Sequence, residues 1–401
     1  MALRKDSCIT IVGAGVFGPT TALHLAKNGY TNIHVFDKQP YDKNNYSYTQ
    51  GADAASADEN KILRASYADR ILRADAERDG IPKSKIDPFG RLERGLPTHG
   101  VLDMTAGFVL ASRACSFALY LCEQAGVEFH LGPEHALMSI EREGSRVQSI
   151  KTANGEQHAA DLVIIACGGW TPSLLPEVEQ LLETTSGSVL SIRIPQHRQD
   201  LWLKYSPERF PVWGWKADGY VPFETVGGIY GLPRTPEGIV KIAFRGAKWT
   251  DYSRKSAENN RPLSYPRTDT KEVPEEAVRV LRSFCEVNMP DLLELDLEYE
   301  RLCWYTDSVD NSFLIDHVPG TENLVVASGG SGHGFKFLPV LGEHVVDVIE
   351  RKDTEYTRLF KWRSVPEGRR NGLEEGPKGW RTLDKQKMAG KGQWRAGGSK
   401  L

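Results

Sequence analysis

The order of apolar and polar residues predicts that the chain begins with a strand, a tight turn and a helix. Residues 9–12 read Ile-Thr-Ile-Val, a β-branched run that is typical of a strand. Apolar side chains recur at helical spacing over residues 20–28, and Gly29 ends that helix. A second strand is predicted over residues 33–36, directly before Asp37.

The turn between the first strand and the helix has the spacing of a dinucleotide-binding loop. Residues 13–18 read Gly-Ala-Gly-Val-Phe-Gly. Gly13 permits the turn, Gly15 lets the backbone approach a pyrophosphate, and Gly18 lets the helix pack close to the strand. Asp37 lies about twenty residues downstream, where an acidic side chain binds a ribose hydroxyl. The predicted cofactor-binding residues of this region are Gly13, Gly15, Val16, Phe17, Gly18, Asp37 and Lys38.

Two later segments complete the pattern. Residues 161–170 form a buried strand that ends in two glycines, and residues 323–336 form a strand with a Gly-rich turn before a helix near Leu338. Because the N-terminal motif has its complement at the far end of the chain, FAD is favoured over NAD, and the second turn can face the flavin through backbone N–H groups.

These segments predict an α/β fold with a Rossmann-like, discontinuous FAD-binding domain and a mixed or antiparallel-sheet substrate domain. The FAD-binding domain is predicted over residues 1–70, 135–185 and 300–363. The substrate domain is predicted over residues 71–134 and 186–299, with a helix over 275–285. Residues 127–130 and 146–152 are expected to form a meander.

Composition narrows the classes of function. A length of 401 residues favours two domains. The net charge of −3 gives no basic excess for nucleic acid, and no apolar run is long enough to predict a membrane span. The six cysteines have no metal-ligand spacing, so no metal is expected.

The C-terminal residues contain a candidate targeting signal. Residues 364–401 are rich in Gly, Lys and Arg, so a flexible tail is predicted. The chain ends in Ser399-Lys400-Leu401, the tripeptide that a peroxisomal import receptor reads. This ending predicts a peroxisomal protein with that receptor as a partner.

Several stretches together resemble the sarcosine oxidase / D-amino-acid oxidase family of flavoproteins. The matching stretches are residues 51–67, 95–107, 166–172, 228–234, 244–250, 302–307 and 330–339. Within the family, the chain is most similar to fungal fructosyl amino acid oxidases (amadoriases), with saccharopine and pipecolate oxidases close behind. The resemblance implies a monomeric FAD-dependent enzyme that oxidises the C–N bond of a secondary amine on an amino acid. The imine product would hydrolyse, and molecular oxygen would become hydrogen peroxide.

The resemblance also implies roles for single residues. It implies that Cys303 bonds covalently to the flavin and that Lys248 promotes the reaction with oxygen through its positive charge. Lys61 and Arg64 are three residues apart, so on a helix they would share a face toward the flavin and the substrate carboxylate. The further expected residues are Lys336 and Arg363 for the carboxylate, and Gly332, His333, Gly334 and Lys336 for the flavin.

One departure from the family pattern leaves alternatives open. After Tyr67 the family continues with several dozen residues that have no counterpart here, where only residues 68–78 intervene. An inactive FAD-binding remnant is therefore one alternative, and a dehydrogenase that passes electrons to another carrier is a second. Saccharopine or pipecolate oxidation is the alternative within the oxidase class.

Overall fold

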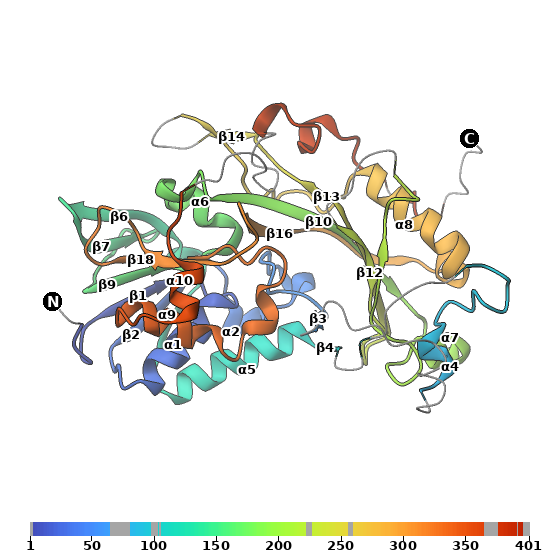
Figure 1. The fold of residues 1–401 in the computed structure, drawn as a ribbon, viewed down its shortest axis with the longest axis horizontal. Helices are drawn as coiled ribbons and strands as arrows, with labels where there is room; N and C mark the ends of the chain where they lie inside the picture. The colour runs from blue at the N-terminus through green and yellow to red at the C-terminus, as the bar shows by residue number, and fades with distance from the viewer. Residues whose placement is uncertain are drawn as a thin grey trace.

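The computed structural model describes residues 3–64, 81–97, 103, 106–221, 227–255, 260–364, 376–390 and 392–395. They form two units, one built on a six-stranded sheet and the other on a five-stranded sheet (Figure 1). The predicted fold class, α/β with a Rossmann-like unit and a second, antiparallel sheet, is confirmed.

The six-stranded sheet joins distant parts of the sequence. Its strands run in the order β17-β18-β9-β1-β2-β5. Their bounds are β17 Leu314–His317, β18 Leu324–Ser328, β9 Leu162–Ile165, β1 Ile9–Val12, β2 Ile33–Asp37 and β5 Glu128–Leu131. Neighbours pair in parallel, except that β17 runs antiparallel to β18. Its inner strands are buried on both faces, which explains their continuous apolar runs.

Helices cover one face of this sheet, and a small sheet covers the other. The helices are α1 Phe17–Lys27, α5 Ala111–Gln124, α9 Leu341–Ile349 and α10 Glu355–Phe360, and they share one apolar core with the strands. The small sheet consists of β6 Leu137–Glu143, β7 Arg146–Thr152 and β8 Gln157–Ala159. Its Val147 and Ile150 pack against Val12 and Val163 of the large sheet.

The second unit is an antiparallel sheet with the order β11-β12-β13-β10-β16. Its strands are β11 Trp213–Lys216, β12 Gly228–Gly231, β13 Ile239–Trp249, β10 Leu182–Arg193 and β16 Leu297–Ser308. Helix α8, Glu275–Asn288, packs on it through an apolar core that includes Phe284. The helix predicted over residues 275–285 is confirmed and continues to Asn288.

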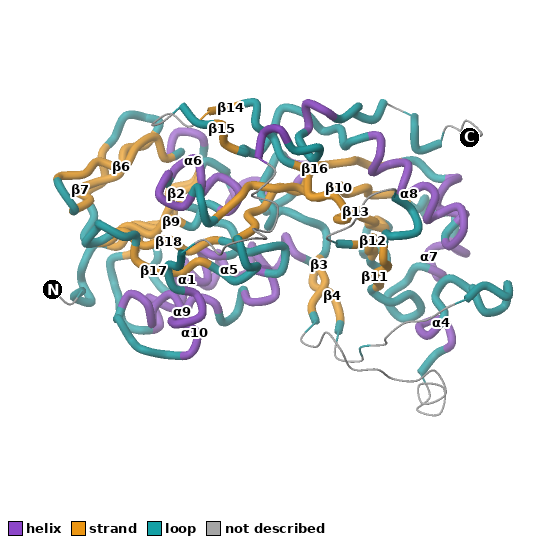
Figure 2. Tube along the Cα trace, turned by 45° about the horizontal axis from the view of Figure 1, so that its top comes forward, coloured by secondary structure: helices purple, strands orange, loops and turns teal. Residues whose placement is uncertain are grey.

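Short elements complete the described chain. They are α2 Tyr41–Asn44, α4 Lys83–Ile86, α6 Thr171–Leu174, α7 Gln199–Lys204, the pair β3 Lys61–Leu63 and β4 Gly107–Val109, and the pair β14 Arg254–Lys255 and β15 Pro262–Leu263. The β3–β4 ribbon lies between the two units (Figure 2). Among the described helices, none combines the length and the apolar character that crossing a membrane requires.

Two domain boundaries differ from the sequence-based prediction. Residues 111–131 belong to the Rossmann-like unit, because α5 packs against α1 and β5 pairs in parallel with β2. The meander expected to include residues 127–130 is therefore wrong at that strand, since a four-residue run carries no signal of its partner. Residues 300–308 belong to the antiparallel sheet, because they continue β16.

The C-terminal segment also differs from the flexible tail that was predicted. Leu383, Ala389 and Trp394 are buried against the second unit. Thr382 bridges to Thr250, and Met388 bridges to Pro274. The cause is a set of apolar residues spaced through an otherwise polar segment, which composition alone averages away. Residues 399–401 lie outside the described residues.

Candidate cofactor and active site

A cavity of about 2060 Å³ is lined by residues of both units. Its wall includes the turn after β1, the end of β2, the Gly-rich turn after β18, and parts of β13 and β16. Pockets for a single small ligand commonly measure about 300–1,000 Å³. The larger volume accommodates a dinucleotide together with a small substrate.

The turn after β1 is built by glycine at two positions. Gly13 has a φ of 109°, and a Cβ there would lie 2.4 Å from the carbonyl oxygen of Ala166. A Cβ on Gly18 would lie 1.8 Å from the carbonyl oxygen of Gly13, so only glycine lets α1 begin this close to the strand. Gly15, Val16 and Phe17 line the cavity, which therefore faces the positive end of the helix.

Asp37 lies at the end of β2, on the same wall. Its carboxylate accepts hydrogen bonds from the backbone N–H groups of Ala14 at 2.6 Å and Gln39 at 2.8 Å. Burial raises the pKa of Asp37 to about 6 despite these two donors. Lys38 pairs with Asp53 at 2.7 Å and lies over the ring of Trp170.

The second Gly-rich turn packs against the first. Gly330 and Gly334 contact the ring of Phe17, where a Cβ would approach to 3.4 and 3.1 Å. Gly332 has a φ of 72°, and a Cβ there would lie 2.2 Å from the guanidinium of Arg245. The two turns therefore form one continuous wall of the cavity.

His333 lies in this turn but is not arranged as a base. Its ring stacks on Phe313 at 5.2 Å, and its Nδ1 lies 3.2 Å from the carbonyl oxygen of Ser331. Burial lowers its pKa below 6.5, so the imidazole is neutral at neutral pH.

Lys248 reaches the cavity from the opposite sheet. It lies within β13, and its Nζ is 3.1 Å from Oδ1 of Asp307 on β16. Burial lowers the pKa of Lys248, and the charge of Asp307 opposes that shift. Lys248 lines the cavity, and Asp307 lies behind it, paired with Glu183 of β10.

Cys303 also lines the cavity, from β16. Its thiol is half-buried, and the residue pairs with Gly187 of β10. A Cβ on Gly187 would lie 3.0 Å from Cγ of Arg245, so glycine at that position makes room for the Arg245 side chain. The structure thus brings Cys303 and Lys248 to one wall and the glycine turns to another.

Lys61 and Arg64 are placed differently from the helix that was predicted. Lys61 begins β3, and Arg64 directly follows that strand. Residues three apart in a strand point to opposite faces, so the expected shared helical face is wrong. Both residues nevertheless line the cavity.

Of the two further predicted carboxylate ligands, only Lys336 lines the cavity. Lys336 lines the cavity, and its Nζ donates to the carbonyl oxygen of Arg64 at 3.3 Å. Arg363 does not line it: its guanidinium pairs with Asp310 at 2.7 Å and donates to the carbonyl oxygen of Phe313. The geometry therefore does not support Arg363 as a substrate ligand.

The sequence analysis named Lys61 but missed Asp58 and Lys241, with which Lys61 forms a charged cluster in the cavity wall. The Nζ atoms of Lys61 and Lys241 each lie 2.9 Å from Oδ2 of Asp58, and all three residues line the cavity. Burial alone would raise the pKa of Asp58, but the two lysines outweigh it and lower that pKa. Two ammonium groups thus share one carboxylate. Asp58 lies in the matching stretch 51–67, which was the available signal.

Arg245 is a second residue that the sequence did not single out. Its Nε donates to the hydroxyl of Tyr305 at 2.9 Å, and the guanidinium lies next to Gly332. It therefore connects β13, β16 and the second glycine turn at the cavity wall.

Comparison with known proteins now gives the class. Residues 46–348 match the family model described as FAD dependent oxidoreductase (DAO). The chain belongs to this family and is an FAD-dependent oxidoreductase. The glycine turns, the helix terminus and Asp37 line the cavity in the pattern that a dinucleotide requires. Gly168 also lines the cavity, and a Cβ there would meet no protein atom within 4 Å, so the space beside it is open to a ligand.

Two relatives illustrate the range within the family. L-saccharopine oxidase of Schizosaccharomyces pombe is 25% identical over 431 residues, covering 88% of this chain and 93% of that protein. Human peroxisomal sarcosine oxidase is 30% identical over 306 residues, covering 74% of this chain and 70% of that protein.

Solved structures share the fold. Fructosyl peptide oxidase from E. terrenum has a TM-score of 0.74 at 21% identity, covering 97% of this chain and 99% of that one. Fructosamine oxidase (Amadoriase II) from Aspergillus fumigatus has a TM-score of 0.73 at 23% identity, covering 97% and 98%.

Proposed function

We propose that this protein oxidises the C–N bond of a secondary amine on an amino acid, with FAD as cofactor and oxygen as electron acceptor. The products are an imine, which hydrolyses, and hydrogen peroxide. The observation that carries the proposal is the union of two features in one cavity. A dinucleotide-binding wall faces strands that bear Lys248 and Cys303, and a cluster of cations lies beside it.

The glycine turns and Asp37 form the wall of the cavity that is proposed to bind FAD. The residues Gly13, Gly15, Val16, Phe17, Gly18, Asp37, Lys38, Gly332, His333 and Gly334 would hold FAD. Bound FAD supplies the acceptor for the hydride that leaves the carbon next to the amine. The protein therefore has to hold the substrate with its amine neutral and that carbon near the cofactor, and a strong base is not required.

The cations define the acidic end of the substrate. Arg64 and Lys336 lie together at the rim formed by β3 and the second glycine turn. A planar guanidinium binds both oxygens of a carboxylate, and an ammonium adds a second charge. Lys61 and Lys241 share Asp58 nearby, so this region carries an excess of positive charge that suits an anion.

Fructosyl amino acids are the substrates that the matching stretches favour, and saccharopine or pipecolate is the alternative. A saccharopine oxidase matches 88% of the chain, which supports testing saccharopine with equal weight. Purified protein should be screened for peroxide with fructosyl-glycine, fructosyl-lysine, saccharopine, pipecolate and sarcosine. Activity only on primary amines or hydroxy acids would overturn the proposed class.

The same screen separates the other readings. Flavin that bleaches with substrate under anaerobic conditions but yields no peroxide in air would identify a dehydrogenase. Bound FAD that no substrate bleaches would identify an inactive remnant. The short segment that motivates this last alternative, residues 68–78, lies outside the described residues.

Cys303 is proposed to hold FAD covalently. Acid-precipitated protein should keep its yellow colour, and Cys303→Ala should release it into the supernatant. Cys167→Ala is the matched control, because Cys167 also lines the cavity but is not the proposed attachment residue. Colour lost from the unmutated pellet would show that attachment is non-covalent.

A peroxisomal location is proposed from Ser399-Lys400-Leu401 and from the peroxisomal human relative. A fluorescent protein fused to the N-terminus should be imported into peroxisomes. Deletion of the last three residues should leave it in the cytosol.

A further inference from the structure

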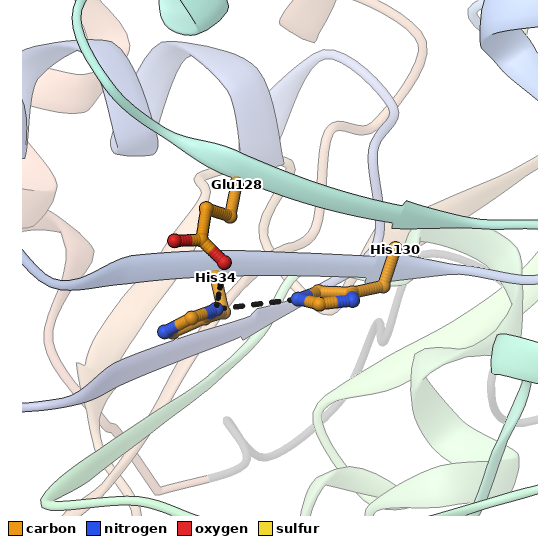
Figure 3. Close-up of side chains that lie close together, drawn as sticks. All are labelled: His34, Glu128 and His130. Carbon is orange, nitrogen blue, oxygen red and sulfur yellow. Dashed lines mark hydrogen bonds and ion pairs between the residues drawn. The ribbon is translucent and has the colours of Figure 1, made fainter.

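A group of three potential metal ligands lies on the edge of the Rossmann-like sheet, away from the cavity. His34 is on β2, and Glu128 and His130 are on the neighbouring strand β5. Figure 3 shows the three side chains converging on one side of these strands. In the parallel register His34 is opposite Glu128, and His130 follows two residues later on the same face.

The distances within the group are those of ligands around one ion. Nδ1 of His34 lies 3.2 Å from Nε2 of His130 and 3.4 Å from Oε2 of Glu128. Zinc binds imidazole nitrogen and carboxylate oxygen at about 2.0–2.2 Å, which puts tetrahedral ligands about 3.3 Å apart. All three candidate ligand atoms lie within 4.8 Å of one another.

A further contact prepares His34 as a ligand. Its Nε2 lies 2.8 Å from Oδ1 of Asn32, which only accepts hydrogen bonds. Nε2 therefore carries the proton, and Nδ1 presents its lone pair to the other two residues. Metal-binding histidines are commonly oriented by an acceptor of this kind on their other nitrogen. Without an ion between them, the Glu128 carboxylate and Nδ1 of His34 would face each other as two hydrogen-bond acceptors.

We propose that His34, Glu128 and His130 form a binding site for a divalent late transition metal of the zinc class. Two imidazoles and one carboxylate suit zinc better than calcium or magnesium. The side chain of Glu128 is 69% exposed, so ions can enter from solvent and water can take the fourth position.

The site has a structural consequence for the cofactor cavity. β5 ends the order of the six-stranded sheet and pairs with β2. The ring of His130 stacks on Phe36 at 4.3 Å, and Phe36 lines the cavity. A bound ion joins β5 to β2 and fixes His130 against Phe36, which stabilises the wall next to Asp37.

Untagged, FAD-containing protein treated with chelator and then dialysed tests the proposal. Isothermal titration with Zn²⁺ should give one site per chain, and metal analysis after gel filtration should find about one equivalent. Zinc at a hundredfold excess over its Kd should raise the Tm by roughly 3 °C.

Matched variants decide whether these residues are the ligands. Glu128→Gln keeps the shape of an exposed side chain and should weaken zinc binding more than tenfold, as should His34→Ala. Asn32→Ala should weaken it about tenfold through the orientation of His34. His197→Ala removes an exposed histidine elsewhere and should bind zinc like the unmutated protein.

Two outcomes would overturn the proposal. One is the absence of a stoichiometric site in the unmutated protein, which would leave a hydrogen bond between the two histidines as the whole interaction. The other is uptake that His34→Ala and Glu128→Gln leave unchanged, which would place the ion elsewhere.

Discussion

Lys248 is the residue proposed to promote the reaction of the flavin with oxygen. Its side chain is 6% exposed, and its Nζ lies 3.1 Å from Oδ1 of Asp307. Because burial lowers its pKa below the ordinary 10.5, its positive charge is lost at a lower pH than that of a free lysine. We expect the rate of flavin reoxidation by oxygen to fall as the pH rises through that lowered pKa.

The variant Lys248→Met should lose that pH dependence and reoxidise about a hundredfold more slowly, since one well-placed charge commonly contributes a few kcal/mol to a barrier. Stopped-flow mixing of reduced enzyme with oxygen measures the rate, and reduction by substrate should change little. The exposed Lys255→Met is the control. Unchanged reoxidation in Lys248→Met would exclude the assignment.

Gly18 offers a second test at the scale of one residue. A Cβ there would meet the carbonyl oxygen of Gly13 at 1.8 Å, and backbone cannot move aside as a flexible side chain can. Gly18→Ala should therefore reduce the free energy of unfolding by about 1–3 kcal/mol or more. It should also weaken FAD binding, because the phosphate-binding turn shifts.

Urea unfolding and flavin content after dialysis measure the two effects. Gly219→Ala is the control, because a Cβ there meets no atom within 4 Å and its φ is ordinary. Equal stability of the two variants would mean that the close approach of helix and turn is not required.

The site residues divide by how local their signal is. Gly13, Gly15 and Gly18 could be predicted because their spacing reflects a turn made within six residues. The short apolar run around Lys61 and Arg64 has no decisive period, so the sequence does not distinguish the helix it predicts from the strand that forms. Asp58 and Lys241 were missed because they meet only when the segment before β3 packs against β13, which is distant in the sequence.

At the scale of elements, the C-terminal segment reaches the active-site region through Arg381. This guanidinium donates to the carbonyl oxygen of Lys248 at 2.5 Å and lies 3.3 Å from Oε2 of Glu183. Arg381→Met would leave Glu183 buried without that partner. Because Glu183 has a pKa of about 7 even beside Arg381, it takes up a proton when that cation is removed, and unfolding by urea should show a loss of about 1–3 kcal/mol from the lost hydrogen bonds.

A double variant separates the ion pair from the packing of the segment. Glu183→Gln combined with Arg381→Met should recover part of the lost stability, since no buried carboxyl group then has to take up a proton. If the double variant is as unstable as the sum of the single variants, the two side chains do not interact.

Glu183 itself should make stability depend on pH. Burial raises its pKa to about 7, and Arg381 opposes that shift without cancelling it. The folded protein thus holds the proton more tightly than the unfolded chain, whose pKa is near 4.5. This stabilisation is fully present below pH 4.5 and is lost as the pH rises through about 7.

The free energy of unfolding, compared with that of Glu183→Gln, should therefore decline from pH 5 to pH 8. Urea titrations at several pH values measure it, and Glu355→Gln, an exposed carboxylate, should follow the unmutated protein. A difference that grows with pH would show that the folded pKa is lowered instead.

At the scale of the whole molecule, FAD should act as a link between the two units. Figure 1 shows the long strands β10 and β16 extending from beside α6 into the second unit. Gly187 of β10 and Cys303 of β16 line the cavity, while the glycine turns that line it belong to the first unit. The sequence predicts the type of each sheet, one Rossmann-like and one mixed or antiparallel. The boundaries could not be predicted, because β5 and the end of β16 find their partners only through long-range register.

A ligand that binds only the folded cavity stabilises it by mass action. Cys303→Ala lacks the proposed covalent link, so FAD can be removed from it and added back. FAD at a hundredfold excess over its Kd should then add about 2.7 kcal/mol and raise the Tm by roughly 3 °C. Tryptophan fluorescence reports mainly on the second unit, and far-UV circular dichroism reports on both units. The Tm measured by each signal should rise together, because the ligand contacts both sheets. A shift confined to one signal would mean that FAD stabilises one unit alone.

Adding Gly18→Ala to Cys303→Ala should abolish most of the rise in Tm with FAD. An undiminished rise in the double variant would place FAD outside the glycine turn.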